Sequence, residues 1–322
     1  MKSVVRFFCL SALVVFFSVG ATAQDFPKRP VKIVVPFPPG GVVDITGRLL
    51  AQELTKQLGQ PVVVENKAGA GGTIGANMVA KSTPDGYTLL PGGAATHAFA
   101  PWIYKTLPYD PVKDFAPITQ LTNGPLALCV LDTSNIKTLQ DMVSLLKKES
   151  SKINYGSNGI GTFPHLSVEL LSNALSVKPL HVPYPGGAQA LNGLLSGEVQ
   201  FTQNHIPVIQ GQAKSGRLRV LATTGESRSK VFPDAPTLKE SGLDIVVSAW
   251  FGLFAPAGTP QPIIEQLYKA TVVATESPAL RERIILQGDE LTVEGPIKLG
   301  AFQTVELQKW KSTIQNAGIK AN

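Results

Sequence analysis

The sequence predicts an α/β fold, and three observations support this prediction. Strand-like and helix-like runs alternate along the chain, with no low-complexity region and no fixed-period repeat, as is typical of α/β proteins. Two glycine-rich segments each join a buried strand to a helix within about forty residues, and open α/β sheets bind ligands at such turns. The length of 322 residues is enough for two domains of common size.

The amino terminus has the pattern of a secretory signal peptide. Lys2 and Arg6 form a positively charged start, Phe7 to Val19 form an apolar core, and Ala21 to Ala23 supply a small-residue cleavage pattern. We therefore expect residues 1–23 to be removed by cleavage after Ala23 and the protein to reside in the periplasm.

The cysteines and the later apolar runs indicate whether the mature chain has a lipid anchor, a disulfide or a membrane-spanning segment. Cys9 lies inside the apolar core of the leader and not after a cleavage motif, so we expect no lipoprotein anchor. Cleavage leaves Cys129 as the remaining cysteine, so we expect no disulfide within the mature chain. No later apolar run approaches the ~18–20 residues that span a bilayer, which predicts a soluble mature protein.

The charge of the chain is moderately positive. The formal net charge is +6, and the basic residues are scattered along the sequence. Such a surface attracts anions in a weak and general way. Nucleic-acid binding, the alternative interpretation of the high isoelectric point, would require a basic stripe with interleaved aromatic residues, which the sequence lacks. We therefore expect no nucleic-acid partner.

The stretch VKIVVPFPPGGVVDITGR, residues 31–48, is the most informative part of the sequence. The β-branched run 31–35 predicts a buried strand, which the prolines and glycines of 36–41 end abruptly, and Asp44 then opens an amphipathic helix. Glycines let a small molecule approach the backbone, and the free N–H groups of a helix start favour an anion such as a carboxylate. The residues expected to contact the ligand here are Phe37, Pro38, Gly40 and Gly41.

The alternative for this segment is an ordinary turn with Asp44 as its helix cap. Because a carboxylate repels an anion, Asp44 suits other tasks better than direct contact with a ligand carboxylate. We expect it to cap the helix, to hold a water molecule or to meet an amino group of the ligand.

A second segment repeats this arrangement. The run Pro61 to Glu65 predicts another buried strand, and the glycine-rich loop 68–72 leads into a second helix. The carboxyl ends of parallel strands meet at one edge of a sheet, so we expect Ala70, Gly71 and Thr73 to face the same pocket as the first loop.

The other elements follow from the same patterns. Strand-like runs lie at 88–90, 126–131, 153–155, 199–202, 220–223 and 245–248. Helical patterns lie at 139–148, 164–175, 188–195, 262–274 and 297–317.

Six segments together resemble one protein family. They are VVPFPPGGVVD, VVVENKAGAGGTIGA, AKSTPDGYTLL, NYGSNGIGT, HVPYPGG and WFGLFAPAGTP, and the resemblance extends over essentially the whole mature chain. The sequence is similar to the Bug family, the extracytoplasmic solute receptors of tripartite tricarboxylate transporters. The resemblance implies a two-lobed, type II-like periplasmic binding protein that closes over a small organic acid in the cleft between its lobes.

The resemblance also implies where the chain passes between the lobes. The chain would leave lobe 1 near residues 120–125 and return near 245–250. Lobe 1 is then discontinuous and comprises residues 24–123 and 246–322, whereas lobe 2 comprises residues 124–245. Two crossings of this kind form a hinge that permits closure.

Lobe 2 is expected to supply the other half of the pocket. The segment 155–162 (YGSNGIGT) follows a short strand and precedes a helix that starts near Pro164, a residue suited to a first helical turn because it has no N–H. Short hydroxyl and amide groups can bond a carboxylate without burying a charge. The expected contacts are Ser157, Asn158, Gly161 and Thr162. Capping by Thr162 and turn formation by Asn158 are the alternative.

Five other residues are candidates for the pocket. Tyr184 lies in the turn HVPYPGG, Thr96 and His97 follow a Gly-Gly pair, and Gln203 and Asn204 close the strand 199–202. For each of them the alternative to ligand contact is a structural role, either in a turn or as a polar group that is hydrogen-bonded within the protein. No arginine lies in the predicted loops, and the resemblance implies that backbone N–H groups and ordered waters bind the carboxylate instead.

Sequence motifs for catalysis, cofactors and metals do not match. The segment GSNG has Tyr155 where a nucleophile elbow needs its first glycine. Ile74 replaces the last glycine of a dinucleotide-binding loop, and Lys81 has no glycine before it, as a phosphate-binding loop requires. The four histidines lack metal-ligand spacing. We predict no enzymatic activity, no metal and no cofactor.

Together with the resemblance, these observations predict a monomeric periplasmic receptor for a small carboxylate. It would present its ligand to the membrane components of a tripartite tricarboxylate transporter. Phe37, Phe163, Tyr184 and Trp250 near the predicted loops favour a ligand with an apolar or aromatic body. Two alternatives stay open, namely a periplasmic sensor that partners a histidine kinase and a secreted hydrolase that uses Ser157 and a histidine.

Overall fold

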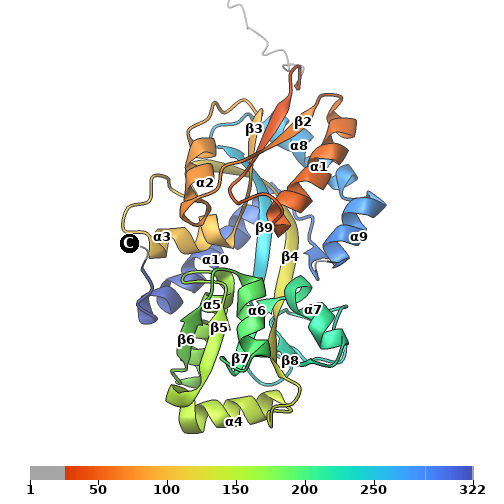
Figure 1. Cartoon of the computed structure of the whole chain (residues 1–322). Coiled ribbons are helices and arrows are strands. Elements are labelled where there is room, and N and C mark those ends of the chain that lie inside the picture. The colour runs from red at the N-terminus through yellow and green to blue at the C-terminus, as the bar shows by residue number, and fades with distance from the viewer. Residues whose placement is uncertain (1–25, 287, 321–322) are drawn as a thin grey trace, which may run out of the picture.

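The computed structural model describes residues 26–286 and 288–320, which form two lobes joined by long strands (Figure 1). β4 (Phe115–Leu131) runs through both lobes, and β9 (Ser248–Pro256) lies antiparallel beside its first part. The predicted α/β fold with two lobes is confirmed. The predicted leader, residues 1–23 with cleavage after Ala23, lies outside the described residues.

The sheet of lobe 1 has the strand order β2-β1-β3-β9-β4. β1 (Val31–Val35) lies between β2 (Val62–Asn66) and β3 (Thr88–Gly93) and is parallel to both. β9 pairs antiparallel with β3 and with β4, and the short β10 (Glu290–Leu291) also pairs with β4. Every residue of β1 except Lys32 is buried, which agrees with its apolar composition apart from this lysine.

Helices cover both faces of this sheet. The helices of lobe 1 in the described residues are α1 (Val42–Leu58), α2 (Thr73–Ala80), α3 (Ala100–Ile103), α8 (Gln261–Ala274), α9 (Pro278–Leu286) and α10 (Pro296–Asn316). A 3-10 turn (Ala70–Gly72) precedes α2, and a π-helical turn (Ala95–Phe99) leads into α3. Leu50 and Leu54 of α1 pack in one cluster with Ile33 of β1.

Lobe 2 is built on the second part of β4. β4 changes its partners at one point, since Pro125 pairs with Ser248 of β9 and Leu126 pairs with His205 of β7. The other elements are α4 (Leu139–Glu149), a 3-10 turn (Ser150–Lys152), β5 (Asn154–Ser157), α5 (Phe163–Leu175), β6 (Leu180–Pro183), α6 (Gly187–Leu195), β7 (Phe201–His205), α7 (Ile206–Lys214) and β8 (Leu218–Thr223). The change of partners lies next to the predicted crossing, whereas the exact domain boundaries stay a prediction.

Some elements differ from the sequence-based expectation. α1 begins at Val42 and not at Asp44, and the strand expected at 245–248 begins at Ser248 and runs to Pro256. The first part of β4, α7 and α9 were not predicted. Pro117 and Pro125 interrupt the strand pattern of β4, and α9 buries little besides Leu280 and Ile284, so neither segment shows a clear periodicity.

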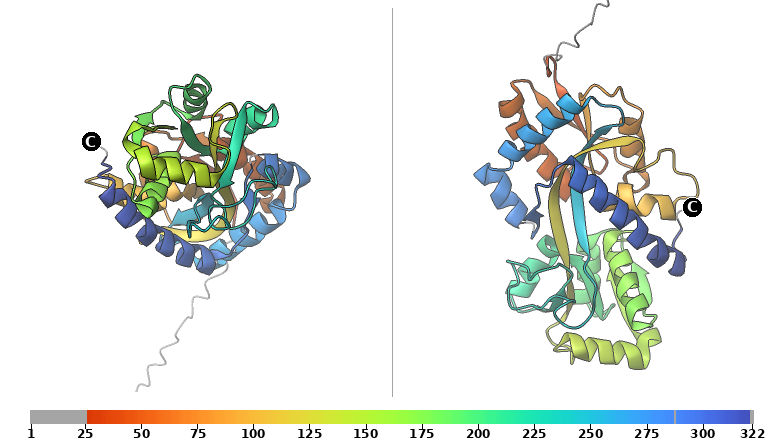
Figure 2. Two further views of the ribbon diagram at one scale, coloured as in Figure 1. Left: turned by 90° about the horizontal axis from the view of Figure 1, so that it is seen from below. Right: turned by 180° about the vertical axis from the view of Figure 1, so that it is seen from behind.

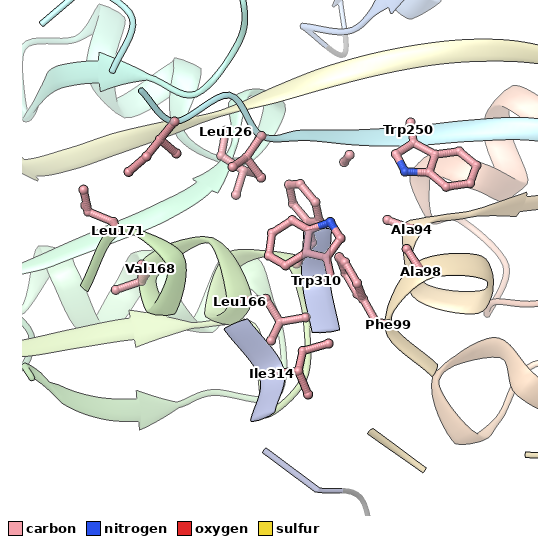
Figure 3. Packing of buried hydrophobic residues seen from close by; sticks show 14 of the residues in the cluster. Ala94, Ala98, Phe99, Leu126, Leu166, Val168, Leu171, Trp250, Trp310 and Ile314 are labelled. Carbon is pink, nitrogen blue, oxygen red and sulfur yellow. The ribbon is translucent and has the colours of Figure 1, made fainter. Parts of the chain in front are cut away.

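The largest hydrophobic cluster extends through both lobes. Trp310 of α10 is fully buried, and its ring centroid lies 4.8 Å from that of Phe99 in lobe 1 and 5.8 Å from that of Phe163 in lobe 2. Figure 3 shows Trp310 between residues of the two lobes, with Ala98 and Phe99 on one side and Leu166 on the other. Seen from behind, α10 runs across the back of the molecule and reaches α5 (Figure 2). This helix therefore ties the lobes together.

Within residues 26–286 and 288–320, no helix has both the length and the apolar character needed to cross a bilayer.

Replacing Trp310 with alanine should lower the free energy of unfolding by about 3–5 kcal/mol, because a buried aromatic side chain is lost and Glu306 Oε2 loses the donor that lies 3.0 Å away. Urea unfolding followed by circular dichroism would measure this change. Val305→Ala on the same helix is the control, since Val305 is 65% exposed and should change stability by about 0.5 kcal/mol or less. Equal effects of the two variants would contradict the packing role of Trp310.

Candidate functional site

A cavity of about 700 Å³ lies between the lobes and is lined by residues of both. Lobe 1 contributes Phe37, Gly41, Val42, Val43, Gly71, Ala94, Ala95, Phe99, Ala100, Ile103, Tyr104, Ala249, Trp250, Phe251, Asp289 and Lys320. Lobe 2 contributes Asn158, Ile160, Gly161, Thr162, Phe163, Pro164, His205 and Pro207. The volume is in the range of small-molecule binding sites.

Helices α1, α5 and α7 all begin at this cavity. Val42 of α1, Phe163 of α5 and Pro207 of α7 lie in the first turns of these helices and line the cavity. Within the described residues, no side chain caps any of the three starts. Their first N–H groups and the positive ends of their dipoles therefore lie at the cavity wall, an arrangement that favours an anion.

The two glycine-rich loops of lobe 1 pack against each other beside the cavity. Gly41 and Gly71 both line it. A Cβ atom at Gly75 would lie 2.8 Å from the carbonyl oxygen of Lys67 and 2.9 Å from Cα of Pro36, so glycine is required for α2 to approach the first loop this closely. Gly71 has a φ of 63°, a conformation that favours glycine.

Asp44 braces the first loop and does not line the cavity. Its carboxylate accepts hydrogen bonds from the Gly40 N–H (2.9 Å), from Asn66 Nδ2 (2.8 Å) and from Arg48 Nε (3.1 Å). Asn66 Nδ2 also donates to the Phe37 carbonyl at 3.1 Å. Burial by itself raises the pKa of Asp44, but the hydrogen bonds from Arg48, Gly40 and Asn66 outweigh this effect and hold the pKa below its ordinary value. Asp44 is therefore an ionised group that positions the loop backbone.

The loop between β5 and α5 brings Asn158, Gly161 and Thr162 to the cavity. Asn158 Nδ2 donates to Asn204 Oδ1 at 3.3 Å, whereas the buried Asn158 Oδ1 has no hydrogen-bond partner among the described residues. The Gly161 N–H donates to His165 Nδ1 at 3.0 Å, and the Thr162 hydroxyl donates to a carbonyl within the loop at 2.7 Å. Asn158 Oδ1 is therefore the group on this loop that is available to a ligand.

The bond from Gly161 requires His165 to be neutral. The rings of His165 and His181 are stacked with centroids 3.8 Å apart. Burial lowers the pKa of His165 to about 3, with a further contribution from His181, and burial lowers the pKa of His181 to about 4. Both rings are neutral at neutral pH, so Nδ1 of His165 can accept the bond that holds the loop.

Ser157 lies behind the loop and not on the cavity wall. Its Oγ is 2.6 Å from His181 Nε2, which resembles the serine–histidine pair of a hydrolase. Ser157 is nevertheless fully buried and does not line the cavity, so a ligand in the cavity does not reach its hydroxyl. The pair joins β5 to β6, and the hydrolase alternative finds no accessible nucleophile at this position.

Other predicted residues also lie behind the cavity wall. Thr96 and His97 are buried and bonded to each other at 2.8 Å, and the ring of His97 stacks on Phe254. Gln203 is buried on β7 and accepts a hydrogen bond from Ser167. The residues that the structure does not bring to the cavity in this way are Ser157, Thr96, His97, Tyr184, Gln203 and Asn204. Pro38, Gly40, Asp44, Ala70 and Thr73 lie in or beside the two lobe 1 loops without lining it.

Much of the apolar wall was not predicted from the sequence. Phe99, Ile103 and Tyr104 line the cavity from the π-helical turn and α3, which carry no binding motif. Asp289 and Lys320 reach the cavity from positions far along the chain. In the part of the chain that the structure describes, no cluster of three His, Cys, Asp or Glu residues could hold a metal ion.

Comparisons with known proteins agree with this architecture. The family model described as "Tripartite tricarboxylate transporter family receptor" matches residues 46–319. The chain is 35% identical to Protein BugT of Bordetella pertussis over 301 residues, which cover 93% of this chain and 92% of BugT.

Two solved structures of similar proteins contain carboxylates. MatC from Rhodopseudomonas palustris with bound malate is 35% identical, with a TM-score of 0.76, and the match covers 90% of this chain and 100% of that one. A protein of R. palustris with adipate is 31% identical, with a TM-score of 0.79, and the match covers 92% and 100% of the two chains.

Replacing Asp44 with alanine should release the first loop and lower the free energy of unfolding by about 1–3 kcal/mol, because Arg48, Asn66 and the Gly40 N–H lose a charged acceptor. Denaturant unfolding would measure this change. Gln52→Ala, at an exposed position on α1, is the control and should have an effect of about 0.5 kcal/mol or less. An Asp44 variant as stable as this control would contradict the bracing role.

Stability should decrease as the pH falls from 6.5 to 4.5. Burial lowers the pKa of His97 and His165 to about 3 and that of His181 and His205 to about 4. The unfolded chain therefore binds protons in this range that the folded chain does not, at a cost of about 1 kcal/mol or more per pH unit. Burial raises the pKa of Asp289 to about 7, and this shift favours the folded chain as the pH falls. It concerns one group, whereas the four histidine shifts favour the unfolded chain. Urea unfolding at several pH values measures the slope, and a flat or rising stability would contradict it.

Proposed function

Because the chain belongs to the tripartite tricarboxylate transporter receptor family, we propose that it binds a small organic carboxylate in the cleft between its lobes and delivers it to the membrane components of such a transporter. In this proposal the protein is a periplasmic monomer that is secreted by its leader. It binds and releases the ligand without changing it chemically.

The observation that carries this proposal is the convergence of uncapped helix starts and glycine-rich loops on one cavity. The first turns of α1, α5 and α7 line the cavity together with Gly41, Gly71 and Gly161. No arginine is among the lining residues. Backbone N–H groups and helix dipoles, each worth about 0.3–1 kcal/mol to a nearby anion, are therefore the groups that would bind a carboxylate. Malate and adipate, found with two relatives, are both carboxylates.

The arrangement of the lobes fits a receptor that closes around its ligand. The cavity has one wall in each lobe, and Phe99 of lobe 1 stacks on Phe163 of lobe 2 with centroids 5.7 Å apart. A ligand that contacts both walls stabilises the closed arrangement relative to an open one. A transporter can then distinguish the loaded receptor from the empty one by its shape.

A thermal-shift screen of residues 24–322 should identify the ligand. The panel contains mono-, di- and tricarboxylates, amino acids and aromatic acids, each beside its uncharged amide as the matched control. An acid present at 100 times its Kd should add about 2.7 kcal/mol of stability, and its amide should add none. A panel in which no acid shifts the transition, or in which the amides act equally, would contradict carboxylate binding.

Asn158→Ala should weaken the binding of the acid that the screen identifies by about tenfold, because the cavity wall loses the amide group whose Oδ1 has no partner among the described residues. Isothermal titration calorimetry would measure the affinity. Asn173→Ala, at an exposed position on α5, is the matched control and should bind like the natural protein. Identical affinities of both variants would remove Asn158 from the site.

Delivery to a transporter is tested in cells. Deletion of the gene should abolish uptake of the identified acid, and a copy that carries residues 1–322 should restore it. Normal uptake together with a lost transcriptional response to the acid would contradict delivery and would favour a sensor that partners a histidine kinase.

A further inference from the structure

We propose that the ligand is dipolar and carries, besides its carboxylate, an amine or hydroxyl group whose hydrogen is donated to Asp289. This inference rests on the proposed function and specifies the class of ligand. It makes Asp289 a specificity-determining residue of the cleft.

Asp289 reaches the cleft from the hinge between the lobes. It follows α9 and directly precedes β10, in which Glu290 pairs with Asn123 of β4. The carboxyl group lies over Gly124, where a Cβ atom would overlap Asp289 Oδ1. Glycine at position 124 therefore provides the space that this carboxyl group occupies beside the cavity.

The carboxyl group of Asp289 has no protein partner in the described part of the chain. No described residue forms a hydrogen bond or an ion pair with it, and burial alone raises its pKa, to about 7. Asp44 in the same lobe shows the contrast, because three donors hold that carboxylate. A half-buried carboxyl group without a partner is unfavourable in the empty protein and gains a bond when a donor enters the cleft.

The charged groups around Asp289 do not neutralise it. On the other side of the hinge, Asp289 borders a smaller cavity of about 310 Å³ with Lys230, Arg281 and Glu290 in its wall, and none of these pairs with it. In the cleft, the ionisable groups are Lys320, Tyr104 and His205, and burial lowers the pKa of His205 to about 4.

The start of α7 also lies close to this position. Gly288 packs against Ile206, so closely that a Cβ atom at Gly288 would lie 2.6 Å from that of Ile206. No N–H group of this turn is bonded to the carboxyl group of Asp289 in the described structure. Asp289 therefore lines the cavity without a hydrogen bond from α7 to its carboxyl group.

Two further buried atoms on the cavity wall lack partners within the described residues. They are the acceptor Asn158 Oδ1 and the donor Trp250 Nε1. A ligand with a carboxylate and a purely apolar body would leave Asn158 Oδ1 and Asp289 unbonded after closure. Sites that are built to bond a polar group reject ligands that lack it, because their own groups then stay unpaired.

The charge distribution of the cleft is itself dipolar. The uncapped starts of α1, α5 and α7 contribute positive potential to the cleft, and Asp289, when ionised, contributes a negative charge next to β10. A second carboxylate near Asp289 would be repelled unless one of the two groups were protonated. An ammonium or hydroxyl group beside Asp289 matches the charge.

Matched ligand series test this inference. The aliphatic series comprises hexanoate, its 2- and 6-hydroxy and 2- and 6-amino derivatives, and adipate. The aromatic series comprises benzoate, 4-hydroxybenzoate, 4-(aminomethyl)benzoate and terephthalate. In calorimetric titrations at pH 8, at least one hydroxy or amino acid should bind about tenfold or more tightly than the unsubstituted acid and the dicarboxylate of its series.

Two variants assign this preference to Asp289. Asp289→Asn has nearly the same shape and should reduce the advantage of the preferred amino or hydroxy acid by about tenfold, while binding of the unsubstituted acid changes little. Glu290→Gln is the matched control because it removes the same charge from the neighbouring residue, which lies outside the cleft. It should leave the preference unchanged.

The pH dependence separates a donor from a second carboxylate. An amino acid that binds ionised Asp289 should release a proton, and its affinity should rise roughly tenfold from pH 6 to pH 8. A dicarboxylate at the same position should take up a proton and bind more weakly at pH 8. Both dependences should be absent in Asp289→Asn.

The outcomes are distinguishable from failure of the proposed function. If carboxylates bind but the unsubstituted acid or the dicarboxylate binds as tightly as every hydroxy and amino acid, this inference is wrong and the receptor function stands. An Asp289→Asn variant that changes all affinities equally would overturn it in the same way. If no acid in either series or in the wider screen binds, the proposed function itself fails.

Discussion

The antiparallel pairing of β4 with β9 is the interaction on which the cleft depends. It extends from Phe115 opposite Pro256 to Pro125 opposite Ser248, with irregular register between Pro117 and Thr119 and between Gln120 and Thr122. Such irregularities bend and twist a strand pair. Because β4 then continues into the sheet of lobe 2, this pair of strands determines where the two lobes meet. Trp250 lies on β9 at this junction and lines the cavity, so the junction of the lobes forms part of the cavity wall.

Polar side chains beside the cavity mainly hold the backbone of the loops that line it. Asp44 fixes the first loop of lobe 1 through Gly40, and His165 fixes the loop of lobe 2 through Gly161. Asp44 is ionised and His165 is neutral. Hydrogen bonds from Arg48, Gly40 and Asn66 lower the pKa of Asp44 despite its burial, whereas burial lowers the pKa of His165. Because these side chains hold the loop backbone in place, backbone N–H groups can give the cleft its affinity for an anion, although no arginine among the described residues lines it.

The aromatic residues connect the core with the cleft. Phe99 and Phe163 belong to the largest hydrophobic cluster, pack against Trp310 and also line the cavity. A movement that opens the lobes would separate these rings and expose apolar surface to water. In the proposed receptor, ligand binding and lobe packing would thus contribute to the same equilibrium between open and closed forms. Within this apolar wall, Asp289, Asn158 and Trp250 carry polar groups that lack partners among the described residues, and the proposed selectivity rests on them.

The sequence by itself determined the fold class and the loops at the strand ends, because buried β-branched runs followed by glycine and proline are local signals. The family followed from the resemblance of six segments. The sequence therefore located Gly41, Gly71, Asn158 and Gly161, which line the cavity. Only the tertiary structure decided which neighbouring side chains face inward. The predicted residues Ser157, Thr96, His97 and Gln203 are turned into the protein. Ser157 and Gln203 bond to residues on other elements, whereas Thr96 and His97 bond to each other. Asp289 and Lys320 reach the cleft through sheet topology and helix packing, which bring distant segments together and leave no trace in local residue spacing.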